Sequence, residues 1–230
     1  MDFELCPAGL EDAEDITRLF QIAFKDNHII GFFHPHTPAH LVWEKDIKNF
    51  SDMIAQGDVY GGRWTKIVEV ATGKTVAFSK WVHPHTLTEE QKKEKEKREL
   101  EKRNGPHLEG SNGPLIDEFV KQLFAGREKW IVPEKTYFLH YLAVDPDYQR
   151  RGLGNMLIRS GLETVDKARA PAYVEASPIG FPLYLKHGWQ PVDQVVIDMR
   201  PYGGKGIERQ NLLMRKPRGS NEAGKASGMG

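Results

Sequence analysis

The stretch LHYLAVDPDYQRRGLGNM, residues 139–156, constrains the fold more than any other part of the chain. The apolar run Tyr137–Val144 predicts a strand, which the Asp-Pro pair after it ends. The spacing of apolar residues predicts a helix over residues 152–167, and Ala172–Ala176 predicts another strand. A strand, a helix and a strand at this spacing predict a crossover unit in an α/β protein with a mixed sheet.

The rest of the chain supplies the elements that complete such a sheet. Acidic residues open a segment, residues 11–24, whose apolar side chains recur at helical spacing, and a second helix is expected over His40–Ala55. The segments Arg63–Val70 and Thr75–Val82 flank a short glycine-containing loop and predict an antiparallel hairpin. Further strands are expected at Phe3–Cys6, Val192–Met199 and Glu208–Arg215, and further helices at Leu115–Phe124 and Phe181–His187.

We expect a single domain over residues 1–217, because a chain of 230 residues with 39% hydrophobic residues has enough apolar surface for one substantial core. Residues 89–103 carry six acidic and seven basic residues and one apolar residue, Leu100. Opposite charges four residues apart predict a solvated helix there. We therefore interpret residues 88–113 as a charged helical insertion, and the polar, glycine-rich residues 218–230 as a disordered tail.

The charge balance and the cysteine content exclude several classes of function. The 32 basic and 32 acidic residues cancel, which disfavours nucleic acid and anionic membranes as partners. The N-terminus lacks the basic start of a signal peptide, and no apolar run approaches the roughly 18 residues that span a bilayer, so we expect a cytoplasmic protein without a membrane partner. The single cysteine, Cys6, excludes an internal disulfide and a cysteine-rich metal site.

The glycines that follow the strand Tyr137–Val144 predict an anion-binding turn. Backbone N–H groups at the start of a helix bind anions, and Gly152 and Gly154 allow an anion to approach them closely. Arg150 and Arg151 add positive charge just before the turn, which suits a pyrophosphate better than a single carboxylate.

Three phosphate-binding motifs use a turn of this kind. The Walker motif GxxxxGK[ST] is not matched, and a dinucleotide fingerprint requires a third glycine where Leu157 stands. Glu175 lies about 20 residues further on, where a ribose-binding acid is expected, so a dinucleotide-dependent enzyme stays an alternative. The third motif, Q/R-x-x-G-x-G/A, is satisfied in full by residues 149–154.

The segment LAVDPDYQRRGLG resembles motif A of the GNAT superfamily of acyl-CoA-dependent N-acyltransferases, whose loop binds the pyrophosphate of coenzyme A. PAYVEAS resembles the family's next strand, and FPLYLKHGW resembles its Tyr-x-x-x-Gly-Phe segment, with Trp189 in place of phenylalanine. Over residues 136–200 the resemblance implies a GNAT-like fold, a central, mostly antiparallel sheet flanked by helices. It also implies transfer of an acetyl group from acetyl-CoA, the cosubstrate, to a primary amine by direct attack in a ternary complex.

The resemblance also assigns residues to the cosubstrate. In GNAT proteins, backbone N–H groups beside a bulge in the strand before motif A polarise the thioester carbonyl, and the same stretch pairs with the pantetheine arm. Here that stretch corresponds to Leu142, Ala143 and Val144. The pyrophosphate loop corresponds to Gln149, Arg150, Arg151, Gly152, Leu153, Gly154 and Asn155.

Tyr184 corresponds to the family's general acid, which protonates the sulfur of coenzyme A. The alternative for Tyr184 is an ordinary core tyrosine on an amphipathic helix. A non-catalytic acyl-CoA-binding protein of the same fold is an alternative for the whole chain, and the presence of Tyr184 argues against it. A covalent route through an acyl-cysteine is disfavoured, because Cys6 lies far along the chain from motif A.

Two residues compete for the role of general base. His140 resembles a histidine of the arylalkylamine N-acetyltransferases that helps remove the amine proton through water, and this strand leans toward a small, aromatic amine as acceptor. Those enzymes carry a second histidine where Phe138 stands here, so a two-histidine relay lacks one member. Glu175, on the next strand, is the other candidate, or else a buried carboxylate in its own hydrogen-bond network.

The tetrapeptide HPHT occurs at His34–Thr37 and again at His83–Thr86. Two H-x-H pairs bind zinc when their loops converge, but the proline in each pair suits a plain turn, and we expect no metal. The first copy joins the two N-terminal helices, where GNAT proteins usually shape the acceptor pocket. Four residues of this loop are therefore expected to contact the acceptor: Phe32, Phe33, His34 and His36.

Overall fold

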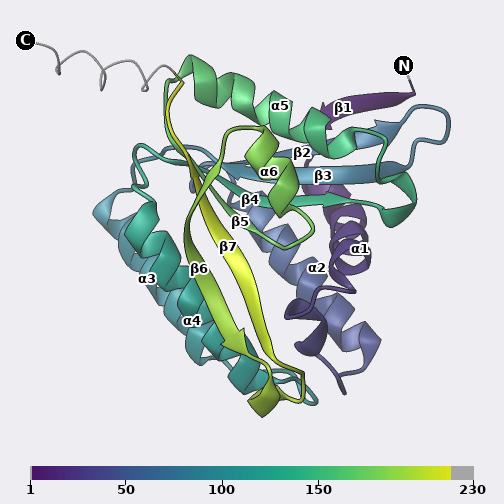
Figure 1. Ribbon diagram of the computed structural model, residues 1–230, viewed down its shortest axis with the longest axis vertical. Helices are drawn as coiled ribbons and strands as arrows, with labels where there is room; N and C mark the ends of the chain where they lie inside the picture. The colour runs from purple at the N-terminus through teal and green to yellow at the C-terminus, as the bar shows by residue number, and fades with distance from the viewer. Residues whose placement is uncertain (1, 219–230) are drawn as a thin grey trace, which may run out of the picture.

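The computed structural model describes residues 2–218, without the side chains of residues 102–104. Within these residues, seven strands form one mixed sheet in the order β1-β2-β3-β4-β5-β7-β6, in which only β4 and β5 run parallel (Figure 1). The strands are β1 Phe3–Pro7, β2 Gly62–Glu69, β3 Thr75–Val82, β4 Tyr137–Val144, β5 Ala172–Ala176, β6 Gln190–Asp198 and β7 Ile207–Arg215. The α-helices are α1 Ala13–Phe24, α2 Ala39–Ala55, α3 Glu89–Asn104, α4 Gly113–Trp130, α5 Leu153–Lys167 and α6 Phe181–Lys186.

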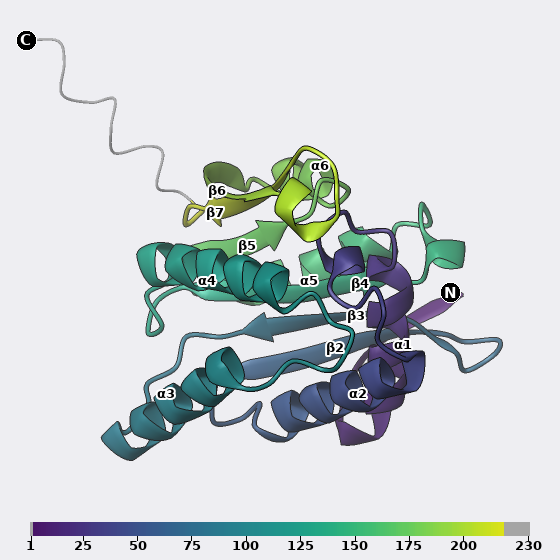
Figure 2. The same cartoon turned by 90° about the horizontal axis from the view of Figure 1, so that it is seen from below.

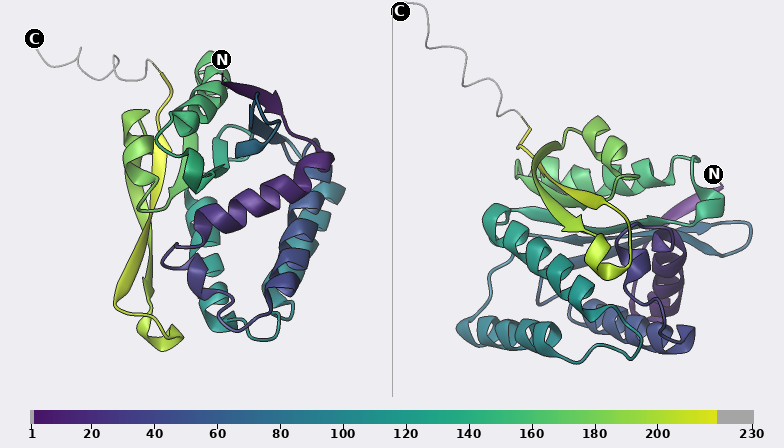
Figure 3. Two further views of the ribbon diagram at one scale, coloured as in Figure 1. Left: turned by 90° about the vertical axis from the view of Figure 1, so that its right-hand side faces the viewer. Right: turned by 60° about the horizontal axis from the view of Figure 1, so that its bottom comes forward.

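Helices cover both faces of the sheet. Helices α5 and α6 lie on one face, and α1, α2 and α4 lie on the other (Figures 1 and 2). Strands β6 and β7 form a long hairpin at the end of the sheet opposite β1 (Figure 3). Among residues 2–218, no helix combines the length and the apolar character needed to cross a membrane.

The mixed α/β fold with a mostly antiparallel sheet, expected from the sequence, is confirmed. The last strand, β7, lies between β5 and β6 in the sheet. The residue patterns of β6 and β7 do not specify this order. Helix α4 continues to Trp130, beyond the apolar stretch expected to end at Phe124. Residues 219–230, most of the expected tail, lie outside the described residues, whereas Arg218 lies within them and its Nη1 is 3.4 Å from Asp166 Oδ2.

The sheet divides between β4 and β5. The two strands pair at only three positions, from Tyr137 with Ala172 to Leu139 with Val174. Beyond this point β4 continues beside β3, and β5 continues beside β7. Within the described part of the chain, the edge of β4 from Tyr141 to Val144 that points away from β3 therefore has no strand partner.

A β-bulge lies where the strands separate. Lys80 of β3 pairs with Tyr141, and the next residue, Trp81, pairs with Leu139, so the register skips over His140. The extra residue shifts the alternation of side chains by one position. Leu139 and Leu142 consequently both pack on the side of α5 and α6, whereas Tyr141 packs with α1 and α2.

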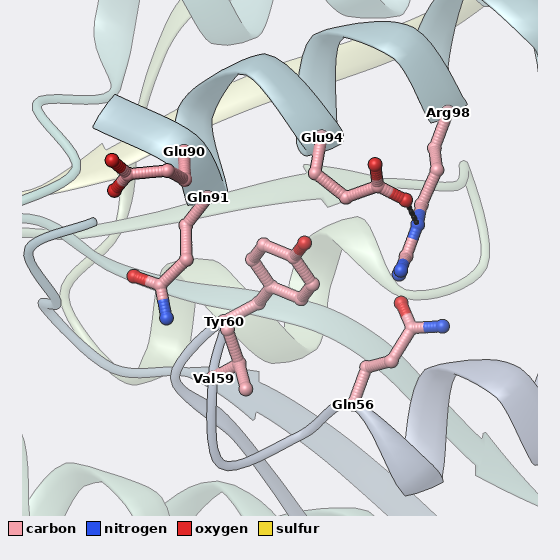
Figure 4. A pocket seen from close by; sticks show the side chains of 7 residues that line it. All are labelled: Gln56, Val59, Tyr60, Glu90, Gln91, Glu94 and Arg98. Carbon is pink, nitrogen blue, oxygen red and sulfur yellow. Dashed lines mark hydrogen bonds and ion pairs between the residues drawn. The ribbon is translucent and has the colours of Figure 1, made fainter. Parts of the chain in front are cut away.

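The charged insertion forms helix α3, which lies beside the end of α2 at the edge of the molecule (Figure 2). Thr88 and Gln91 form a capping box at its start, and Glu94 accepts a hydrogen bond from Arg98 Nε at 2.8 Å. Most of its side chains are exposed, as the composition predicts. Tyr60, from the loop after α2, points into a hollow of about 330 Å³ between α3 and that loop (Figure 4).

Candidate functional site

The turn between β4 and α5 has the geometry of an anion-binding site. Arg150 and Gly152 have left-handed backbone conformations, with φ of 63° and 85°, and such conformations turn successive N–H groups toward one point. A Cβ atom at Gly152 would meet no atom within 4 Å, so the space beside it is open. Met156 N–H donates to the carbonyl of Gly152 at 3.0 Å, and by helical geometry the N–H groups of residues 153–155 lack acceptors in the helix.

Hydrogen bonds and ring contacts hold this turn in shape. The buried Asp145 accepts from the N–H of Asp147 at 3.1 Å and from Lys74 Nζ at 2.9 Å. Burial opposes ionisation of Asp145, but the hydrogen bonds from Lys74 and from the N–H of Asp147, together with the charges of Lys74 and Arg18, outweigh it and lower the pKa of the carboxyl group. The guanidinium of Arg151 lies 4.8 Å from the ring centre of Tyr148. The hydrogen bonds of Asp145 therefore fix the start of the positively charged loop, and the contact between Arg151 and Tyr148 fixes its end.

Helix α6 places Tyr184 beside the point where β4 and β5 separate. Its ring is buried in one cluster with Leu139 and Val174, the last paired residues of the two strands. An edge-on contact with Trp189, 5.8 Å between ring centres, fixes the ring further. Burial raises the pKa of Tyr184, so the phenol keeps its proton at neutral pH.

The same helix is tied to the anion-binding turn. A Cβ atom at Gly154 would lie only 3.1 Å from Leu183 Cδ2, so the absence of a side chain lets α6 approach the first turn of α5. The Nε2 atom of His187 lies 2.9 Å from Asn155 Oδ1. The position of Tyr184 is thus coupled to that of the turn.

His140 lies on the face of the sheet opposite Tyr184. Its ring stacks on those of Phe138 and Tyr141, with centres 4.8 and 4.2 Å away, and both of these rings pack on the side of α1, α2 and α4. The bulge therefore presents the imidazole at the point where β4 leaves β5. The two candidates for proton transfer, His140 and Tyr184, approach this point from opposite faces.

Glu175 forms a bidentate salt bridge with Arg127 of α4. Arg127 Nε lies 2.7 Å from Glu175 Oε1, and Nη2 lies 2.7 Å from Oε2. Burial alone would lower the pKa of Arg127, but the Glu175 carboxylate outweighs it and raises the value, so the arginine is charged. Because both carboxylate oxygens are engaged, the geometry favours His140 over Glu175 as the base.

The structure adds charged residues that the sequence patterns did not single out. Arg127 follows Leu123 by four residues on the buried stripe of α4, and Asp46 precedes Phe50 by four residues on the inner face of α2. A charged residue at a position that continues an apolar stripe is the signal that identifies both, because charged side chains are rarely buried without a role.

The first HPHT loop is closed by the segment that follows α3. Residues 33–37 and 107–112 form what we call the loop clasp, in which His34 Nδ1 lies 2.8 Å from Ser111 Oγ. Burial, and to a smaller extent the charge of Lys45, lowers the pKa of His34 to about 4. Other hydrogen bonds of the loop clasp run from Thr37 Oγ1 to the carbonyl of Glu109, from His36 N–H to the carbonyl of Gly110, and from Asn112 N–H to the carbonyl of Phe33.

The remaining residues of the HPHT loops lie apart from one another. Phe32 and Phe33 pack with the cluster of α4, and Phe33 contacts Phe119 at 5.5 Å between ring centres. The ring of His83, from the second copy, packs on Tyr137 at 4.9 Å. Within residues 2–218, no three histidine, cysteine, aspartate or glutamate side chains are grouped as metal ligands.

Comparison with known proteins agrees with this geometry. Residues 120–191, which include the anion-binding turn and Tyr184, match the model of the acetyltransferase (GNAT) domain. The resemblance inferred from the motifs is thus confirmed for this part of the chain, which is similar to a GNAT acetyltransferase domain.

Solved structures of GNAT acetyltransferases share the fold over almost the whole chain. A polyamine N-acetyltransferase of Drosophila melanogaster, which catalyses the formation of N-acetylagmatine, has a TM-score of 0.62 and 16% identity over 94% of this chain and 100% of its own. A mosquito arylalkylamine N-acetyltransferase-like protein, 5b, has a TM-score of 0.60 and 16% identity over 93% and 99%. The PaiA N-acetyltransferase of Thermoplasma acidophilum, in complex with coenzyme A, has a TM-score of 0.50 and 12% identity over 94% and 99%.

Loss of Arg127 is expected to destabilise the protein, because Glu175 would be left buried without its cation. Arg127→Met should lower the free energy of unfolding by about 3–5 kcal/mol, measured by urea denaturation. Adding Glu175→Leu should restore most of this loss by removing the second charge. The control is Lys129→Met, which breaks an exposed ion pair with Asp193 and should cost at most about 1 kcal/mol. Equal losses for Arg127→Met and Lys129→Met would contradict the assignment.

Proposed function

We propose that this protein is an acetyl-CoA-dependent N-acetyltransferase that acts on a primary amine by direct attack in a ternary complex. The observation that carries the proposal is that the partnerless edge of β4 leads directly into the anion-binding turn of α5. An extended ligand with amide groups and a pyrophosphate matches both features in that order.

The donor side follows from this arrangement. Backbone groups of Leu142, Ala143 and Val144 pair with the pantetheine amides and, next to the bulge, polarise the thioester carbonyl. The N–H groups of residues 152–155 bind the pyrophosphate, and Gly152 leaves room for it. Three other residues of the turn contribute positive charge or polar contacts: Gln149, Arg150 and Arg151.

The acceptor nitrogen attacks the thioester carbon from the face that carries His140. A bond forms between the nitrogen and the acetyl carbon, and the bond between that carbon and sulfur breaks. His140 takes the proton of the amine through water, and Tyr184 gives its proton to the departing thiolate, so the products are an acetamide and coenzyme A. Burial suits Tyr184 for this role because it keeps the phenol protonated until the thiolate forms.

Two further observations support direct attack with His140 as the base. Cys6, the one cysteine of the chain, lies in β1, and β2 and β3 separate that strand from β4, so an acyl-cysteine intermediate has no thiol at hand. Glu175 is engaged by Arg127, and we assign the pair the role of holding β5 and α4 together beside the site.

The comparisons support the choice of ligands. The named activities of the structural neighbours, arylalkylamine and polyamine acetylation, favour an amine as acceptor. The neighbour in complex with coenzyme A favours this donor over a dinucleotide.

The proposal is tested by ligand binding and turnover on the purified chain. Acetyl-CoA, but not NAD, should raise the melting temperature, because a ligand that binds only the folded state stabilises it. A panel of primary amines should then release free coenzyme A, detected with a thiol reagent. Stabilisation by NAD alone would refute the proposal, and binding of acetyl-CoA without turnover of any amine would favour a non-catalytic acyl-CoA-binding protein.

Tyr184→Phe should lower kcat by about 100-fold or more, because it removes the proton donor and keeps the bulk of the ring. Pre-steady-state measurements must show that the chemical step limits the rate. The melting temperature and the KM for acetyl-CoA should change little. Wild-type turnover by Tyr184→Phe, with chemistry rate-limiting, would exclude Tyr184 as the acid.

His140→Gln should remove the acidic limb of the profile of kcat/KM against pH, because this limb reports the protonation of the base in the free enzyme. Activity at neutral pH should fall about 100-fold. Glu175→Gln serves as the comparison, since it keeps the shape of that side chain and removes its charge. A limb that persists in His140→Gln and disappears in Glu175→Gln would reverse the assignment.

A further inference from the structure

We infer that the acceptor is an amine with a second cationic group, and that Asp46 on α2 binds this second group. The inference rests on the proposed function and identifies the substrate class of the same site. It follows from the position of Asp46 on the acceptor face, from its lack of a cationic partner, and from the contacts that connect its helix with Tyr141.

Asp46 lies on the inner face of α2, one helical turn before the buried Phe50. Phe50 contacts the ring of Tyr141 at 5.6 Å, and Phe20 of α1 contacts the same ring at 5.8 Å. The apolar cluster between α1, α2 and β4 therefore gives way to polar side chains within one turn of α2. At that level α1 contributes Gln21, whose Nε2 donates to Asp46 Oδ2 at 2.9 Å.

Asp46 differs from the other inward-facing carboxylates. Three of these have a basic partner: Asp12 pairs with Lys66, Asp145 with Lys74, and Glu175 with Arg127. Among the residues that the structure describes, Asp46 has no basic group within ion-pair distance, and its Oδ1 atom accepts no hydrogen bond.

The surroundings of Asp46 favour a bound cation. Burial raises the pKa of Asp46, and the hydrogen bond from Gln21 and the charge of Lys45 lower it by less. These two groups therefore do not fully offset the cost of burying the charged carboxylate. A cation placed beside the carboxylate would lower that pKa again and recover the cost of burial. Lys45 does not fill this role, since its own pKa is lowered by burial and its charge acts on His34 of the loop clasp.

Tyr141 connects Asp46 to the reaction centre. The ring of Tyr141 packs on Phe50, the residue one helical turn after Asp46, and burial raises the pKa of Tyr141 to about 12. The ring of Tyr141 in turn stacks on His140, with centres 4.2 Å apart. Contacts that run from His140 through Tyr141 to Phe50 on α2 thus connect the position of the reacting amine with the helix that carries Asp46.

This arrangement identifies the chemical class of the acceptor. A short aliphatic chain that joins a primary amine to an ammonium or guanidinium group would place its amine at His140 and its second cation at Asp46. Of the other charges on this face, Arg127 and Glu175 neutralise each other, and the ammonium of Lys80 lies over the ring of Trp64, 5.3 Å from its centre. Asp46 is the carboxylate that we assign to the cation. A monoamine of similar length gains nothing from the carboxylate.

The experiment compares diamines with monoamines. Wild-type kcat/KM should be at least about 10-fold higher for putrescine and agmatine than for butylamine, because a charge-assisted hydrogen bond contributes that much to binding. Asp46→Asn keeps the hydrogen bond with Gln21 and removes the charge. It should raise the KM for both dications about 10-fold or more, and change the KM for butylamine and for acetyl-CoA less than 2-fold.

Two matched variants complete the design. Asp52→Asn, on the same helix but in an exposed pair with Lys48, should leave every KM unchanged. Asp46→Glu, which restores the charge, should recover part of the preference for dications, and melting temperatures establish that each variant is folded.

The failure of this inference differs from the failure of the proposed function. Turnover of butylamine and putrescine with equal kcat/KM, or an equal loss for both in Asp46→Asn, would overturn the role of Asp46 and leave the acetyltransferase activity standing. No turnover of any amine by the wild-type chain would refute the proposed function and this inference with it.

Discussion

The separation of β4 from β5 after three paired positions is the constraint on which the rest of the site depends. Among the described residues it leaves the edge of β4 from Tyr141 to Val144 without a strand partner, and the bulge puts His140 and Tyr141 on one face of the sheet and Leu139 and Leu142 on the other. A regular strand would put His140 on the side of Leu142, which is the face that carries Tyr184. Under the proposed function, the open edge would receive the extended ligand, and each face would supply one of the two reacting groups.

The two faces differ in how their charges are balanced. On the side of α5, the site consists of backbone N–H groups and a buried phenol, Tyr184, and it presents donors and positive potential. On the side of α1, α2 and α4, charged side chains are enclosed, and the opposite charges of Arg127 and Glu175 neutralise each other within one salt bridge. Under the proposed function, an anionic donor and a cationic acceptor would be drawn to different sides of one sheet and would meet at the bulge.

The sequence predicts the anion-binding turn and its neighbouring elements far better than the arrangement on the opposite face of the sheet, for a physical reason. Residues 137–167 form a strand, a turn and a helix in direct succession, so spacing along the chain carries the geometry. The opposite face carries Asp46, Arg127, His140 and Glu175, which come from four separate elements, so their placement depends on tertiary packing. The sequence identified His140 and Glu175 as competing bases, but the salt bridge that distinguishes them involves a residue 48 positions away from Glu175.

The loop clasp joins the charged insertion to residues 33–37, the loop that we expect to contact the acceptor. The segment after α3 holds residues 33–37 and, through Asn112 Nδ2 and the carbonyl of Tyr202, also reaches the turn between β6 and β7. The insertion thereby connects residues 33–37 with the turn between β6 and β7. We therefore expect a change in the length of the connection between β3 and α4 to shift both of these segments together.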